Sequence, residues 1–247
     1  MSLPFDLSAG QGGFLAAALL LAAFIRGYSG FGFSAIFIIL AALTTNPLPL
    51  IPVVFACEIA MTAFQARDIG PHIDWRRAAM LWVGAAVATV PAIAVMVRLG
   101  EDQARLAISL MVLALSLFLL SGWQLRRAIG GRGNLGVGLL SGLANSAGVG
   151  GLPVAAFLTA QPIPPAVFRA TMIAFLTGLD MMALPVMAAN GLVGPETLTG
   201  VVLAFPVLGL GVWVGTRGFA IASQTQFRRG VVLLLTTLSL LNIAKVM

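Results

Sequence analysis

Long apolar runs dominate this sequence, and no other feature limits the possible folds as strongly. A helix of about 20 apolar residues crosses the hydrocarbon core of a bilayer. Only 9% of the 247 residues are charged and 60% are hydrophobic, whereas soluble domains are roughly 25% charged and cover their surface with polar groups. We therefore predict an all-α polytopic membrane protein. Its uninterrupted spans are expected near residues 49–66, 77–97, 104–125, 166–189, 197–216 and 229–246.

Two further apolar stretches are each interrupted by a glycine-rich break, and they cover residues 12–43 and 134–160. The breaks, Gly27–Phe33 and Asn145–Pro153, occupy equivalent places in the two halves of the chain. This duplication predicts one integral membrane domain made of two repeats, residues 1–129 and 130–247. In each repeat a broken first segment, either re-entrant or discontinuous, precedes three transmembrane helices.

The distribution of arginine and lysine indicates the topology, because these residues collect on the cytoplasmic side of membrane proteins. If each broken stretch returns to the side from which it enters, the two repeats are inverted relative to one another, as in many secondary transporters. Only Arg98, Arg105 and Lys245 then lie on the opposite side of the membrane from the other basic residues. We expect both termini outside a bacterial inner membrane. Two complete short spans in the first stretch would give the same parity. The residues expected to share the cytoplasmic face are Arg67, Arg76, Arg77, Arg126, Arg127, Arg132, Arg169, Arg217, Arg228 and Arg229.

The glycine-rich breaks are the first candidates for a binding site. Backbone N–H groups that leave a helix at membrane depth need another partner, and the N-terminus of a helix favours an anion. Paired interrupted segments in two repeats also mark the substrate sites of transporters. The alternative is that these glycines only allow close helix packing. The candidate substrate-binding residues at the breaks are Ser29, Gly30, Gly32, Asn145, Ser146, Gly148 and Gly150.

Polar and charged residues within the apolar spans form a second group of candidates, because burying them is expensive unless they serve a cavity or a partner. Arg26 precedes the first break and is a candidate to hold an anion through its planar guanidinium, or to extend to the membrane interface. Arg169 begins a predicted helix and either contacts substrate or anchors that helix. Gln65 and Thr171 are weaker candidates for the same cavity, since each could instead bond only the backbone.

Glu58 and Asp180 are acidic residues near the middle of their predicted helices. The repeat places them about one turn apart on equivalent helices. Buried acids at such positions serve proton coupling, cation coordination or pairing with a buried arginine such as Arg26. The sequence leaves coupling and charge pairing equally open for both residues.

The break motifs, GxxGFG beginning at Gly27 and GVGGxP beginning at Gly148, resemble those of the TauE/SafE family of sulfite exporters and sulfonate permeases. The duplicated halves add to this resemblance, which spans essentially the whole chain. It implies a permease for small anions, with sulfite, organosulfonates or related carboxylates bound between the two broken segments at mid-membrane.

A secondary transporter is therefore the leading hypothesis, and an anion channel of the same architecture is the alternative. A membrane-embedded enzyme is disfavoured, because one histidine, His72, and one cysteine, Cys57, offer little for catalysis or metal binding. We expect no metal and no cofactor, and the basic residues lack the pattern of a nucleic-acid binder. The expected partners are a small anion, the lipid bilayer, a coupling proton or ion, and further copies of the chain in a homo-oligomer.

Overall fold

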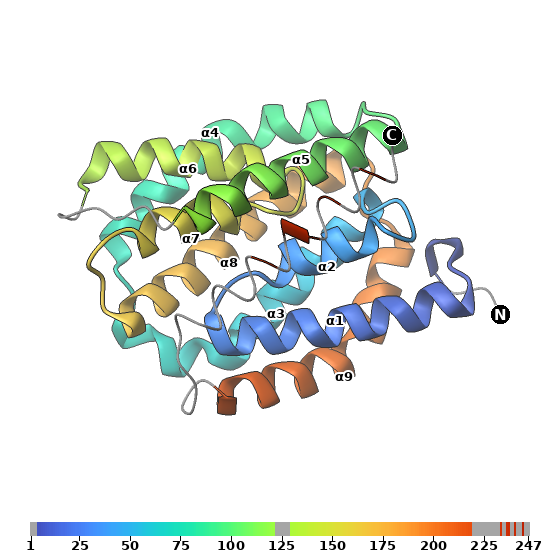
Figure 1. Cartoon of the computed structure of the whole chain (residues 1–247), viewed down its shortest axis with the longest axis horizontal. Helices are drawn as coiled ribbons and strands as arrows, with labels where there is room; N and C mark the ends of the chain where they lie inside the picture. Colours follow the sequence, from blue (N-terminus) through green and yellow to red (C-terminus); the bar gives the residue numbers. More distant parts are fainter. Residues whose placement is uncertain are drawn as a thin grey trace.

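The computed structural model describes residues 4–121 and 129–218, together with the single positions 233, 236, 237, 240 and 244. Most of the span expected at 229–246 and the end of the one expected at 104–125 lie outside these residues, as do Arg126, Arg127, Arg228, Arg229 and Lys245. The described part is built of helices and contains no strand. Figure 1 shows these helices as a bundle. They are α1 (Ala9–Ser29), α2 (Phe33–Ala41), α3 (Ile51–Ile69), α4 (Trp75–Met96), α5 (Glu101–Leu120), α6 (Gly131–Asn145), α7 (Gly151–Thr159), α8 (Pro165–Ala189) and α9 (Pro195–Gly218).

Several of these helices are long and apolar enough to cross a membrane, which confirms the prediction of an all-α polytopic membrane protein. They are α1, α4, α5, α8 and α9. Large apolar side chains face outward from them, and Val87 on α4 and Leu198 on α9 are 66% and 69% exposed. Outward apolar surface of this kind is expected where hydrocarbon surrounds the protein.

Local sequence signals fix the helix ends. At the start of α1, Gln11 N donates to Ser8 Oγ at 3.3 Å, and Ser8 N donates to Gln11 Oε1 at 2.9 Å, which is a capping box. At the start of α4, Arg77 N donates to Asp74 Oδ1 at 3.0 Å. α8 begins at Pro165, whose fixed φ suits the first turn of a helix.

Two pairs of helices pack especially closely, α1 against α9 and α4 against α6 (Figure 1). In the first pair, a side chain at Gly27 would collide with the carbonyl oxygen of Val212. In the second, a side chain at Gly84 would collide with the carbonyl oxygen of Leu135. The glycines therefore allow the backbones to approach, as small residues do in membrane helices. α3 and α8 pack against each other. α3 also contacts α9, and α8 also contacts α4.

The helix is interrupted at both predicted places, between Ser29 and Phe33 and between Asn145 and Gly151. α1 has 21 residues and rises about 32 Å, enough to cross a roughly 30 Å core. α2 and α7 have 9 residues each and rise only about 14 Å. Neither short arm is long enough for a complete span.

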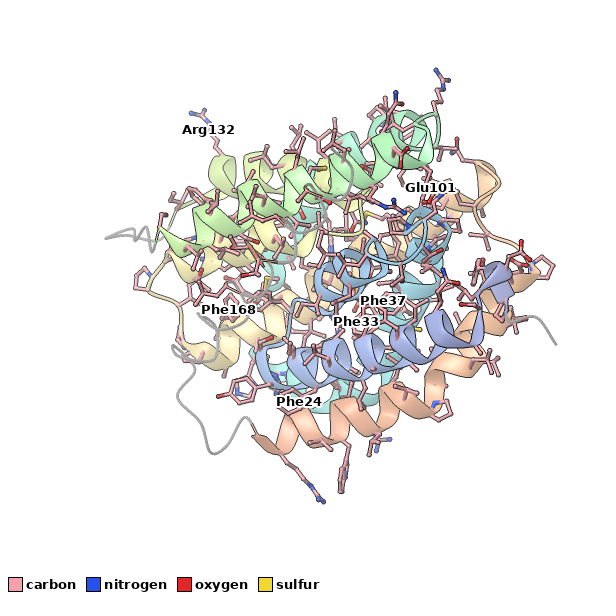
Figure 2. All side chains as sticks on the ribbon, turned by 45° about the vertical axis from the view of Figure 1, so that its right-hand side comes forward. Phe24, Phe33, Phe37, Glu101, Arg132 and Phe168 are labelled. Atoms are coloured by element: carbon pink, nitrogen blue, oxygen red, sulfur yellow. The ribbon has the colours of Figure 1, made fainter. Side chains whose placement is uncertain are left out.

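Each broken segment turns back toward the end from which it starts. After α2, the carbonyl oxygen of Thr44 accepts a bond from Gln11 Nε2 near the start of α1, at 2.9 Å. After α7, Gln161 Oε1 accepts a bond from the backbone N–H of Ile129, just before α6, at 2.9 Å. Side chains fill the space between α1 and α2, where Phe33 and Phe37 lie (Figure 2).

Candidate functional site

A buried ion pair joins α1 to α3. Arg26 Nη1 donates to Glu58 Oε1 at 2.8 Å, and neither residue is exposed. Arg26 Nη2 donates to Thr62 Oγ1 at 3.1 Å, and the Thr62 hydroxyl donates to the backbone carbonyl of Glu58 at 3.0 Å. Charge pairing, one of the roles that the sequence left open for Glu58, is therefore what the structure shows.

Asp180 faces this ion pair from α8. It is fully buried, and the Glu58 carboxyl and the Arg26 guanidinium are its charged neighbours. Neither oxygen of its carboxyl accepts a hydrogen bond from a donor among the described residues, and the Glu58 carboxyl lies within hydrogen-bonding reach of it. One turn earlier on α8, the Thr177 hydroxyl lies 2.7 Å from the Thr62 hydroxyl. We call Arg26, Glu58, Thr62, Thr177 and Asp180 the charge cluster.

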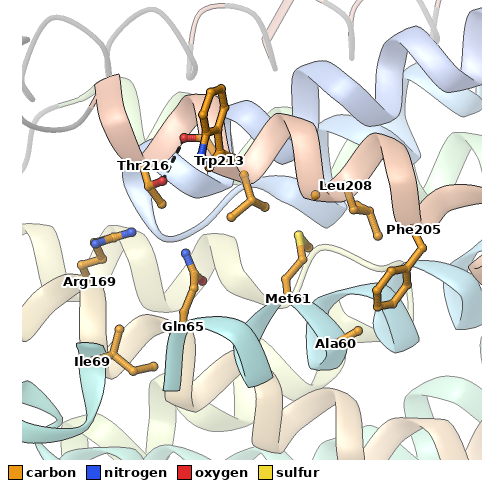
Figure 3. A pocket seen from close by; sticks show the side chains of 11 residues that line it. Ala60, Met61, Gln65, Ile69, Arg169, Phe205, Leu208, Trp213 and Thr216 are labelled. Atoms are coloured by element: carbon orange, nitrogen blue, oxygen red, sulfur yellow. Dashed lines mark hydrogen bonds between the residues drawn. The ribbon is translucent and has the colours of Figure 1, made fainter. Parts of the chain in front are cut away.

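A cavity of about 560 Å³ lies between α3, α8 and α9. Most of its wall is apolar and includes Met61 and Phe205, but Gln65 and Arg169 also line it. Figure 3 shows the Gln65 amide and the Arg169 guanidinium projecting into the same space between α3 and α9. We call it the Gln65–Arg169 cavity.

Gln65 is the most informative residue in this wall. Its side chain is buried, and neither amide atom has a hydrogen-bond partner in the part of the chain that the structure describes. Leaving a buried amide without a partner costs about 1–3 kcal/mol. A polar ligand in the cavity would remove that cost.

Arg169 is held in place at the same cavity by the first break. Its Nη2 donates to the backbone carbonyl of Gly27 at 3.0 Å. Gly30 packs against the aliphatic part of the arginine, because an added Cβ there would lie 2.7 Å from Arg169 Cγ. The unwound end of α1 therefore positions a cation at the cavity wall.

The charge cluster and the cavity lie along one face of α3. Glu58, Thr62 and Gln65 are separated by four and three residues, the spacing that places side chains on the same side of a helix. Gln65 lines the cavity at one end of this row, and Glu58 contacts Arg26 at the other. Only about two helical turns of α3 therefore separate the charge cluster from the cavity.

The first break has the backbone that only glycine adopts readily. Gly30 and Gly32 have φ angles of 81° and 89°, which is the left-handed region. Ser29 Oγ lies 2.8 Å from the backbone carbonyl oxygen of Phe31, so this hydroxyl serves the turn itself.

The second break is closed by its own hydrogen bonds. The amides of Ser146 and Gly148 donate to the carbonyls of Leu143 and Asn145, and the Ser146 hydroxyl donates to the same Leu143 carbonyl. Gly148, with φ 72°, packs against Ile38 of α2, and Gly150 packs against the Asn145 side chain. Asn145 Nδ2 has no hydrogen-bond partner among the described residues.

The structure thus divides the candidate residues among several places. Gln65 and Arg169 share the cavity, the buried acids share the charge cluster with Arg26, and the second break lies against α2. Thr171 stands apart, because its hydroxyl accepts a bond from the backbone N–H of Asp74 at 3.0 Å.

Sequence reasoning missed the contribution of α9 to the cavity. Trp213 and Thr216 line it, the Thr216 hydroxyl donates to the Trp213 carbonyl at 3.0 Å, and the Arg217 guanidinium lies 3.7 Å from the centre of the Trp213 ring. Nothing in the local sequence distinguishes these positions from the rest of an apolar span. Only the packing of α9 on α3 brings them to the site.

The apolar outer faces and the buried charged interior define a polytopic α-helical integral membrane protein with a polar site between its helices. The chain belongs to the sulfite exporter TauE/SafE family, whose family model matches residues 15–241. The resemblance indicated by the break motifs is therefore confirmed. Neither a curated protein nor a solved structure matches the chain.

Proposed function

We propose that this protein is a secondary transporter of small anions, and that its substrates are sulfite, organosulfonates or related carboxylates. The family supports a membrane transporter of sulfur-containing anions. The observation that supports this binding site is the Gln65–Arg169 cavity, where the Arg169 guanidinium lines the same space as the Gln65 amide, and the amide has no described partner. The substrate binds in this cavity, beside the first break.

The chemistry of the two side chains suits a sulfonate or carboxylate headgroup. A guanidinium offers a planar fork of N–H donors that matches such an anion and stays charged at any accessible pH. The Gln65 amide adds an N–H donor to a second oxygen of the same headgroup. The apolar wall around Met61 and Phe205 accepts the organic part of a larger anion.

The architecture that we propose is two inverted repeats, residues 1–129 and 130–247, each opening with a re-entrant hairpin. Helix packing supports it. If α1 corresponds to α6 and α4 to α9, exchanging the halves converts the α1–α9 contact into the α6–α4 contact, and both are observed. The return of each hairpin to its own starting end supports re-entry.

The charged helix ends support an orientation with both termini outside a bacterial inner membrane. Arg67 ends α3, Arg76 and Arg77 begin α4, and Arg169 lies near the start of α8. The Asp74–Thr171 hydrogen bond joins the α3–α4 connection to the start of α8, so these ends share one face. A basic face of this kind is the cytoplasmic one.

Purified protein in liposomes tests the proposal. A thermal-shift panel of sulfite, ethanesulfonate, benzenesulfonate and acetate would first identify the anions that stabilise the folded protein, because a ligand of the native state raises its stability. Counterflow of the radiolabelled binder then separates a carrier from a channel. Saturable counterflow is the expected result. Stabilisation by no anion, or flux that does not saturate, would contradict the proposed function.

A further inference from the structure

The charge cluster holds more acid than base. Arg26 occupies one oxygen of Glu58, whereas Glu58 Oε2 and both oxygens of Asp180 accept no hydrogen bond from a donor among the described residues. These three charged side chains are fully buried. Two ionised carboxylates beside one guanidinium would leave an uncompensated charge in the interior, which is far more costly than a paired one. The cluster therefore has a place for one more positive charge.

A proton fits this place better than a metal ion. Hard metal cations are bound by several oxygen ligands at once. The described residues contain no group of three or more His, Cys, Asp or Glu side chains that could hold a metal. A proton needs only a carboxyl oxygen that no other donor occupies, and Asp180 has two.

The charges that face Asp180 come from α1 and α3, as Arg26 and Glu58. α4 packs on α8 through Trp82, whose Nε1 donates to the carbonyl oxygen of Phe175 at 2.9 Å, and α7 carries no charged residue. The other basic residues on elements packed against α8 lie at the ends of α3, α4 and α6 or in the turn Gly70–His72. They are Arg67, His72, Arg76, Arg77 and Arg132.

We propose that Asp180 binds a proton that is transported together with the anion, while Glu58 stays paired with Arg26. The inference rests on the proposed function, because it names the coupling ion of the same transporter. Asp180 does not contact the anion. It acts on the anion through the proton that it binds.

The row of polar residues on α3 explains how proton and anion influence one another. Glu58 and Gln65 are seven positions apart on one helix, a rise of about 10 Å. Asp180 itself lies eleven positions from Arg169 on α8, a rise of about 17 Å, so its carboxyl lies roughly 10–17 Å from the anion. At an effective dielectric constant near 20, unit charges at such distances alter each other's binding roughly 5- to 15-fold. A proton on Asp180 therefore strengthens anion binding about tenfold, and a bound anion strengthens proton binding equally, because coupling is reciprocal.

Proton uptake on ligand binding tests this inference directly. Ethanesulfonate is the probe, because it is the anion of a strong acid and releases no proton near neutral pH. Adding it to purified protein in weakly buffered solutions at a series of pH values should raise the pH of the solution over one part of the series, where Asp180 is deprotonated in the free protein and protonated in the complex. D180N should bind ethanesulfonate without this change. E196Q, which alters an exposed acid at the start of α9, should behave like the unmodified protein.

Transport assays give a second and independent readout. An acidic outside should drive accumulation of labelled ethanesulfonate in liposomes. D180N should keep anion counterflow and lose this accumulation, because exchange does not require the proton to leave. Accumulation by D180N at the level of the unmodified protein, or a sodium gradient that replaces the pH gradient, would overturn the assignment.

If D180N does not fold, binding, counterflow and proton uptake of the unmodified protein still test the inference. Binding and counterflow of ethanesulfonate without proton uptake at any pH of the series would refute proton coupling at Asp180 and leave the proposed function intact. Neither binding nor counterflow would contradict the proposed function and this inference with it.

Discussion

Arg26 and Glu58 form an ion pair of 2.8 Å between α1 and α3 with both side chains removed from solvent. The pair joins the helix that ends in the first break to the helix that lines the Gln65–Arg169 cavity. Thr62 and Thr177 extend the connection to α8. The pair therefore has a structural role in holding three helices together, and this role is separate from contact with substrate.

Arg26→Ala should destabilise the protein strongly. It leaves the Glu58 carboxylate buried without its cation, and breaking one partner of a buried pair costs about 3–5 kcal/mol. The double variant R26M/E58L should recover much of this loss, because it replaces both charges by apolar groups. Thermal unfolding in detergent measures both effects, with R132A as an exposed control. Equal stability of R26A and the unmodified protein would show that the pair does not hold these helices.

Arg169→Ala should lower anion affinity about tenfold or more, because a hydrogen bond to a charged group contributes about 1.5–3 kcal/mol. R169K should recover only part of it, since an ammonium lacks the planar fork of donors. Ligand-induced thermal shifts across a concentration series give the affinity. R132A is the matched control and should bind as the unmodified protein does. Unchanged affinity in R169A would remove this residue from the binding site.

Gln65→Leu should affect binding and stability in opposite directions. The leucine removes an amide that has no partner among the described residues, so the folded protein should be as stable as before or slightly more so. Anion affinity should fall, because a donor is lost from the cavity wall. Thermal unfolding with and without ligand separates the two effects. A loss of stability without ligand would show that the amide is satisfied in the empty protein.

Two neighbouring glycines of α6 provide a matched test of helix packing. A side chain at Gly138 would collide with the backbone carbonyl of Leu81 on α4, whereas nothing lies within 4 Å of a Cβ at Gly136. We expect G138A to lose about 1–3 kcal/mol of stability through overpacking. G136A should be neutral or stabilised by up to about 1 kcal/mol, because alanine favours the helix. Equal thermal unfolding of the two variants would contradict the close α4–α6 contact.

The spans that became α4, α5, α8 and α9 could be predicted from the sequence, because the thickness of a bilayer is encoded in the length of an apolar run. The span expected at 49–66 is instead a shorter apolar helix, Leu48–Ala63, and α1, expected as part of a broken stretch, is long enough to cross. The breaks could be predicted for a similar reason. Gly30, Gly32 and Gly148 adopt left-handed backbone conformations, which few other residues tolerate, so clustered glycine in an apolar stretch indicates an interruption.

The arrangement of the site could be predicted only in part. Buried charges are rare enough in membrane helices that Arg26, Glu58 and Asp180 were evident as a group. Which of them pair, however, depends on how α1, α3 and α8 pack. The cavity depends on a contact between α3 and α9, and Trp213 has no local feature that marks it. Sequence therefore indicates the polar residues, while tertiary packing decides which of them share a space.

The position of a bound anion tests the central claim most directly. Crystals grown with 2-bromoethanesulfonate would locate the ligand by the anomalous signal of bromine. We predict the sulfonate oxygens beside Arg169 and Gln65, with the bromine toward Phe205 and Leu208 in the apolar part of the cavity. A bromine signal beside the second break at Gly148, remote from Arg169, would contradict the proposed site.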